Sequence, residues 1–87
     1  MNSTIRRRLW RSIIETLAKK KGISYDILNR ITLRKITQTN SGLYISLVDP
    51  ITNFMYVVLL DQQGQIKTLT QEEEASWYAR FQATDDT

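Results

Sequence analysis

The side chains able to do chemistry are few, because the 87 residues include no histidine and no cysteine. The chain therefore lacks the usual general base at neutral pH, a thiol nucleophile and the commonest metal ligand. A disulfide framework, a cysteine zinc site and an iron–sulfur cluster are excluded as well. The three glycines stand apart from one another, so there is no glycine-rich phosphate-binding loop.

The carboxylates have structural explanations in the sequence itself. Asp49 and Asp61 flank turns, where an aspartate bonds its own backbone. Three consecutive glutamates follow Thr70, and the spacing from Thr70 to Glu73 is that of a capping box at the start of a helix. Tyrosines and lysines remain as chemical groups, but no spacing singles any of them out. We therefore predict that the chain is not an enzyme and uses no cofactor, metal or small-molecule substrate.

The basic side chains suit a different kind of chemistry, which is contact with phosphate groups. Residues 1–35 carry ten basic and two acidic side chains, a net +8, and residues 36–87 carry two basic and seven acidic ones, a net −5. The candidate nucleic-acid contacts are Arg7, Arg8, Arg11, Lys19, Lys20, Lys21, Arg34 and Lys35. The competing interpretation is a solvated helix face that the acidic last helix balances. No helix-turn-helix, zinc-finger or aromatic RNA-recognition motif favours nucleic acid further.

Most of these basic residues fall in a segment that we predict to form an N-terminal helix. The helix is expected to begin near Ile5 after a cap at Ser3 or Thr4. Its apolar arc at helical spacing contains Leu9, Trp10, Ile13, Ile14 and Leu17. Four arginines and no acid in the first 14 residues also resemble an organelle presequence. The helical pattern runs straight into the domain, which favours a basic first helix of the mature fold. A small domain needs its tryptophans in the core, so we expect no membrane-surface partner.

After Gly22 and one further helical turn over residues 24–29, the apolar period changes from 3.6 to 2. Four strands are predicted, at residues 31–38, 43–49, 54–60 and 65–69. Their connections are too short for parallel pairing, so the sheet is an antiparallel meander. A C-terminal helix follows the capping box. The predicted fold is a single α+β domain over residues 1–87, with residues 1–4 and 83–87 frayed: an N-terminal amphipathic helix, a four-stranded antiparallel β-meander and a C-terminal helix.

The two middle strands are apolar on both faces. In a sheet with one face in water, apolar and polar side chains would instead alternate along each strand. If a four-residue turn pairs Asp49 with Phe54, one face collects Leu43, Ile45, Leu47, Phe54, Tyr56, Val58 and Leu60. The other face shows Tyr44, Val48, Met55, Val57 and Leu59, which are the candidate protein-interface residues. Either both faces are covered, by one helix on each face or by a sheet that wraps on itself, or both helices share one face and leave the other for a partner. A homodimer that buries this face of both copies is then the simplest way to cover it.

We therefore predict a small non-catalytic protein-interaction module, an adaptor, accessory subunit or inhibitor. It acts on a partner protein or a second copy through an apolar sheet face and charged helices. The alternative is a nucleic-acid-binding regulatory protein that uses the basic N-terminal helix. No secretory segment is evident, and the longest apolar stretch, residues 54–60, is far shorter than the roughly 20 residues that span a bilayer. We expect a cytoplasmic location.

Overall fold

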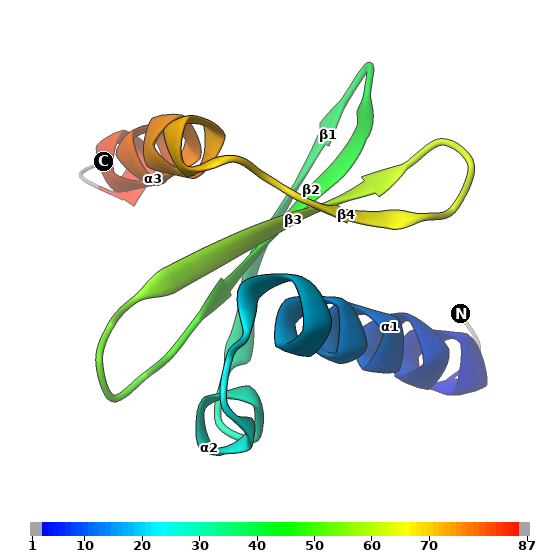
Figure 1. The fold of residues 1–87 in the computed structure, drawn as a ribbon. Coiled ribbons are helices and arrows are strands. Elements are labelled where there is room, and N and C mark those ends of the chain that lie inside the picture. The colour runs from blue at the N-terminus through cyan, green and yellow to red at the C-terminus, as the bar shows by residue number, and fades with distance from the viewer. Residues whose placement is uncertain (1–2, 86–87) are drawn as a thin grey trace.

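The computed structural model describes the backbone of residues 3–85 and the side chains of residues 7–80. These residues form three helices and one four-stranded sheet (Figure 1). In chain order the elements are α1 (Ser3–Lys21), α2 (Tyr25–Leu28), β1 (Thr32–Thr39), β2 (Gly42–Val48), β3 (Met55–Asp61), β4 (Ile66–Thr68) and α3 (Gln71–Asp85). The predicted α+β fold is confirmed, and each strand lies within one residue of its expected ends.

The helix ends follow local sequence signals. Helix α1 begins at Ser3, two residues earlier than predicted, and ends before Gly22, whose φ of 64° is the left-handed conformation that glycine adopts readily. The capping box is confirmed, because the Thr70 amide donates to the Glu73 carboxylate at 3.0 Å and the Glu73 amide donates to the Thr70 hydroxyl at 3.2 Å. The bond from the Thr70 amide lowers the pKa of the Glu73 carboxyl below its ordinary value. Of the ends predicted to fray, residues 3–4 and 83–85 belong to α1 and α3, and residues 1–2 and 86–87 lie outside the described residues.

The strands form an antiparallel sheet in the order β1-β2-β3-β4, as the meander prediction requires. Val48 lies opposite Met55, and the Asp49 amide donates to the Phe54 carbonyl at 2.9 Å. This register confirms the predicted pairing of Asp49 with Phe54. Both faces of the middle strands are therefore apolar, and both need cover.

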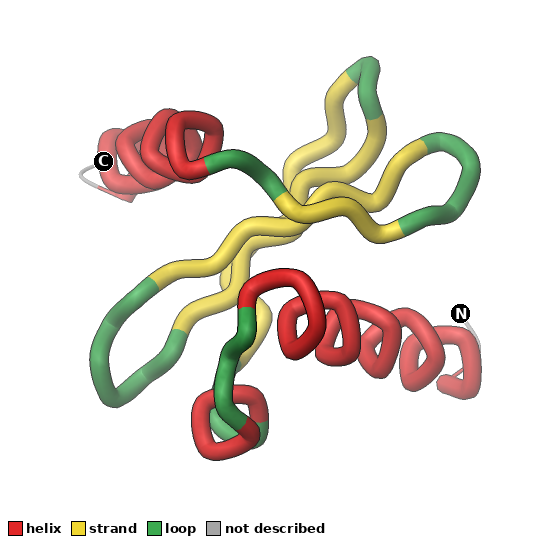
Figure 2. Tube along the Cα trace, in the orientation of Figure 1, coloured by secondary structure: helices red, strands yellow, loops and turns green. Residues whose placement is uncertain are grey.

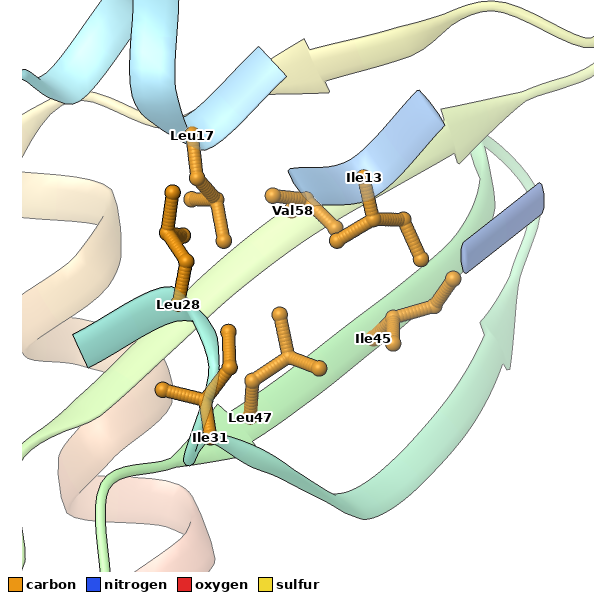
Figure 3. Packing of buried hydrophobic residues seen from close by; sticks show 7 residues of the cluster. All are labelled: Ile13, Leu17, Leu28, Ile31, Ile45, Leu47 and Val58. Atoms are coloured by element: carbon orange, nitrogen blue, oxygen red, sulfur yellow. The ribbon is translucent and has the colours of Figure 1, made fainter. Parts of the chain in front are cut away.

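One helical layer covers each face of the twisted sheet, with α1 and α2 below it and α3 above it in the views of Figures 1 and 2. On the α1 side the buried cluster consists of Ile13, Leu17, Leu28, Ile31, Ile45, Leu47 and Val58 (Figure 3). On the α3 side a smaller buried cluster consists of Met55, Val57, Leu69 and Trp77.

The placement of α3 corrects one of the two arrangements inferred from the sequence. One helix on each face is the arrangement found, and the arrangement with both helices on one face is wrong. The physical reason lies directly after β4, where the buried side chain of Leu69 joins the cluster on the α3 side. The chain therefore enters α3 on that side, and Trp77 of α3 packs over Met55 and Val57.

Candidate partner-binding surface

The predicted interface residues lie on the face that α3 covers. Val57 is 1% exposed, and Met55 is also buried. The remaining three, Tyr44, Val48 and Leu59, are half-buried. The ring of Tyr44 stacks on Trp77 with 4.4 Å between the ring centroids. A partner would reach Val57 only after α3 moved away, and Met55 contributes only its edge to a groove beside α3. These residues therefore form no open platform, and their role in binding stays a prediction.

Most of the predicted nucleic-acid contacts lie on the solvent side of α1. Arg7, Arg8, Arg11, Lys19 and Lys20 are all exposed there. Glu15 is the one acidic residue in the helix. At a rise of about 1.5 Å per residue, the stretch from Arg7 to Lys20 is about 20 Å long. Helix α1 therefore presents a cationic side to solvent.

Lys21 differs from its neighbours because it joins two helices. Its ammonium group donates to the Glu74 carboxylate at 2.6 Å and to the Leu69 carbonyl at 3.0 Å. Both partners of this ion pair are largely covered. For Lys21, the acidic start of α3 does balance the basic end of α1.

The basic residues at the start of β1 do not continue the cationic side of α1. Lys35 lies opposite Ser46 and so faces the α3 side of the sheet, while Arg34 falls at an irregularity in the pairing of β1 with β2. Arg30 donates from Nε and Nη2 to the two carboxylate oxygens of Asp49, at 2.8 and 2.7 Å. These bonds hold the pKa of the buried Asp49 carboxyl well below its ordinary value and raise the pKa of Arg30.

A bulge at Arg34 brings two large apolar side chains to one face at the outer edge of the sheet. Leu33 pairs with Leu47 and Ile36 pairs with Ile45, so both lie on the α1 side. In a regular strand, residues three positions apart face opposite sides, and the extra residue of a bulge changes this. Leu33 is 52% exposed and Ile36 is 50% exposed. This pair was not predicted from the sequence, although two large apolar residues three positions apart in a strand were the available signal.

The outer strand is exposed because α1 does not reach across the whole sheet. Helix α1 lies close to β4, which forms the opposite edge from β1. Strands lie about 4.8 Å apart, so the two edge strands are about 14 Å apart. A helix with its side chains is about 10 Å wide. Helix α1 therefore leaves the β1 side of this face to the short helix α2, whose Leu28 is buried in the cluster, and Leu33 and Ile36 stay about half exposed.

A groove beside α1 lies on the same face of the sheet. It is lined by Arg7, Trp10, Arg11, Ile14, Leu28 and Asn29. Trp10 and Ile14 pack against the buried cluster of the α1 side, which includes the cross-strand partners of Leu33 and Ile36. The groove also reaches the end of α2, just before β1 in the chain. We call the groove together with Leu33 and Ile36 the outer-strand surface.

Another exposed apolar side chain, Phe54, lies in the turn between β2 and β3. It is 57% exposed and contributes to two grooves. Its ring contacts Tyr56 with 4.9 Å between the ring centroids. The charged residues that line these grooves are Lys21 and Glu74, which pair with each other. The surroundings of Phe54 therefore lack the excess of positive charge that borders the outer-strand surface. Phe54 provides a matched site for control substitutions.

The two aspartates that flank turns are held by backbone amides, as predicted. Asp49 Oδ1 accepts from the Ile51 amide at 3.0 Å, and Asp61 Oδ1 accepts from the Gln63 and Gln65 amides at 3.0 and 2.9 Å. Among the residues that the structure describes, no group of three or more aspartate, glutamate, histidine or cysteine residues could hold a metal ion. Within that same part of the chain, no helix is both long and apolar enough to cross a membrane.

No family model, curated protein or solved structure matches the chain. The functional conclusion therefore depends on the geometry and charge of the surfaces described above.

Proposed function

We propose that the chain is a non-catalytic protein-interaction module that binds a partner protein through the outer-strand surface. The observation that carries the proposal is the exposure of Leu33 and Ile36 together, on the same face as the groove that contains Trp10. Protein interfaces combine an apolar centre with a polar rim, and tryptophan and arginine are enriched among their strongest contributors. The outer-strand surface has this composition, with Arg7 and Arg11 along the groove.

A different protein suits this surface better than a second copy does. A two-fold dimer joins the same surface of both copies, so Arg7 and Arg11 of each copy would meet a surface of like charge. The bulge and the cation at Arg34 also oppose edge-to-edge pairing of two β1 strands. The homodimer expected from an open sheet face also loses its original reason, because α3 covers that face.

Peptide display against the immobilised full chain tests the proposal. We expect micromolar binders whose affinity falls about tenfold or more when Leu33→Gln and Ile36→Gln are combined, as for residues at the centre of an interface. Phe54→Gln, at similar exposure, should leave the affinity unchanged. The absence of binders, or binders that depend on Phe54 and ignore Leu33 and Ile36, would overturn the proposal.

Sedimentation of the free chain provides the second measurement. We expect a monomer at the concentrations used for peptide binding. A dimer that the combined Leu33→Gln and Ile36→Gln substitutions dissociate would instead assign the outer-strand surface to self-association.

Binding of nucleic acid is the second candidate function, and the cationic side of α1 favours it. Arg8, Lys19 and Lys20 are exposed but do not line the groove, so they can be changed separately from the outer-strand surface. Phosphate contacts make affinity fall steeply with salt, with a slope of about 0.9 per DNA phosphate neutralised. Salt-dependent binding of labelled duplex DNA or single-stranded RNA that is lost on combining Arg8→Glu with Lys19→Glu would support this function. Undetectable binding, or binding that the charge reversal leaves intact, would contradict it.

A further inference from the structure

Beside α1, the β1 side of this face is covered in part by the one-turn helix α2, and Leu33 and Ile36 remain about half exposed. Packed helices lie about 8–10 Å apart, and the edge strands of this sheet are about 14 Å apart. A helix placed beside α1, which lies close to β4, would therefore sit over β1. Leu33 and Ile36 would contact it from the sheet, and Trp10 and Ile14 would contact it from α1.

An extended peptide fits this place less well than a helix does. Strand addition depends on main-chain hydrogen bonds along a regular edge. The bulge between Leu33 and Lys35 interrupts that regularity in β1. Leu33 and Ile36 also project from the face of the sheet, where side chains and not backbone groups make the contacts. An amphipathic helix uses such side-chain contacts, with anchors at i, i+3, i+4 and i+7.

The charges around the groove specify the flank of that helix. Arg7 and Arg11 line the groove one helical turn apart, and both are exposed. Glu15 is the one acidic residue of α1. Complementary charge guides encounter and disfavours wrong partners. The helix should therefore carry carboxylates on the flank that faces α1.

A second copy of the chain does not supply such a helix. Its α1 packs Ile13 and Leu17 into its own core and exposes a basic side. Its α3 packs Trp77 into the cluster on the opposite face of its own sheet. Among the residues that the structure describes, the apolar sides of α1 and α3 are thus already packed, which favours a helix from a different protein.

From this geometry we infer that the partner segment is an amphipathic helix with an acidic flank, which lies beside α1 and over β1. The inference rests on the proposed function and adds the conformation and charge of the partner. The partner helix would then lie beside α1 in the helical layer of this face, which α1 and α2 form in the free chain.

The peptides recovered by display test the inference through their own sequences. We expect apolar residues at helical spacing, a net negative charge and a gain of helical circular dichroism on binding. Affinity should fall about tenfold when Arg7→Gln and Arg11→Gln are combined. The matched control, Arg8→Gln with Lys19→Gln, removes the same charge away from the groove and should keep the affinity. Glutamate-to-glutamine exchange in the peptide should weaken binding too, and it leaves the fold of the protein untouched.

Failure of the inference differs from failure of the proposed function. Peptides that need Leu33 and Ile36 but have alternating apolar residues, or a positive charge, would overturn the acidic helix and leave the protein-binding function standing. If neither the combined Arg7→Gln and Arg11→Gln substitutions nor the glutamate-to-glutamine exchange in the peptide lowers the affinity, the acidic flank is overturned in the same way. Binders that ignore Leu33 and Ile36, or none at all, would overturn the proposed function itself. Duplex DNA that displaces the peptide at equal or lower concentration would reassign the groove to phosphate binding.

Discussion

The substitution Val57→Lys distinguishes a sheet face that α3 covers from a face left open. Val57 is 1% exposed and belongs to the buried cluster with Met55, Leu69 and Trp77. On an open face, Val57→Lys would be solvated and would remove partner binding while the helices stayed intact. Under α3 the new ammonium group would lie in an apolar cluster, so we expect the substitution to unfold the chain.

The expected size of the effect follows from burial. Loss of the buried valine side chain costs about 1.5–3 kcal/mol. An unpaired ammonium group in the same place costs several kcal/mol more, unless α3 detaches or the lysine loses its proton. At about 0.05–0.15 kcal/mol per residue, a chain of 87 residues has about 4–13 kcal/mol of stability. The single substitution therefore removes a large part, or all, of the free energy of folding.

Urea unfolding followed by tryptophan fluorescence and far-ultraviolet circular dichroism measures this effect. Val57→Ala, which keeps an apolar side chain, should lose about 2 kcal/mol, and its Tm should fall by about 8–16 °C. Ile36→Lys is the matched exposed control and should stay within about 1 kcal/mol of wild type. A Val57→Lys protein with the wild-type midpoint would refute the covered face and restore the open platform.

Three other contacts can be tested by single substitutions. Hydrogen bonds depress the folded-state pKa of Asp49 below its ordinary 3.8, so the stability that it contributes is present above 3.8 and is lost as the pH falls towards the folded-state pKa. Urea midpoints measured from about pH 6 to about pH 2 should therefore fall less steeply in Asp49→Asn than in wild type, and equal slopes would contradict the buried pair. Lys21→Ala should cost about 1 kcal/mol in urea unfolding, whereas Lys20→Ala should stay within about 0.5 kcal/mol; equal losses would argue against the link between α1 and α3. Gly42→Ala should lower the stability by at least about 1 kcal/mol, because φ is 137° and the new Cβ would overlap a backbone carbonyl of β3; an unchanged Tm would count against this hairpin geometry.

The elements and the central register were predictable because each depends on neighbouring residues. The change of apolar period marked the boundary between α1 and the sheet, and the turn residues after Asp49 set the pairing of β2 with β3. The capping box marked the start of α3 for the same reason. Local hydrogen bonds and side-chain periodicity decide these features, so one sequence is sufficient.

The candidate surface was less predictable because it depends on where distant segments meet. The side of the sheet that receives α3 depends on the direction of the chain at Leu69, which periodicity does not report. The bulge at Arg34 moved Ile36 onto the α1 side, against the expected alternation. The basic residues also looked alike in the sequence, although Lys21 pairs with α3 and its neighbour Lys20 remains exposed.

Amide chemical-shift mapping with the tightest selected peptide would show whether the outer-strand surface is the binding site, because it locates the bound peptide on the isotope-labelled chain. We expect the largest changes within residues 7–14 and 28–36, which contain the outer-strand surface. Changes concentrated instead in residues 51–56 and 75–79, around Phe54, would contradict it.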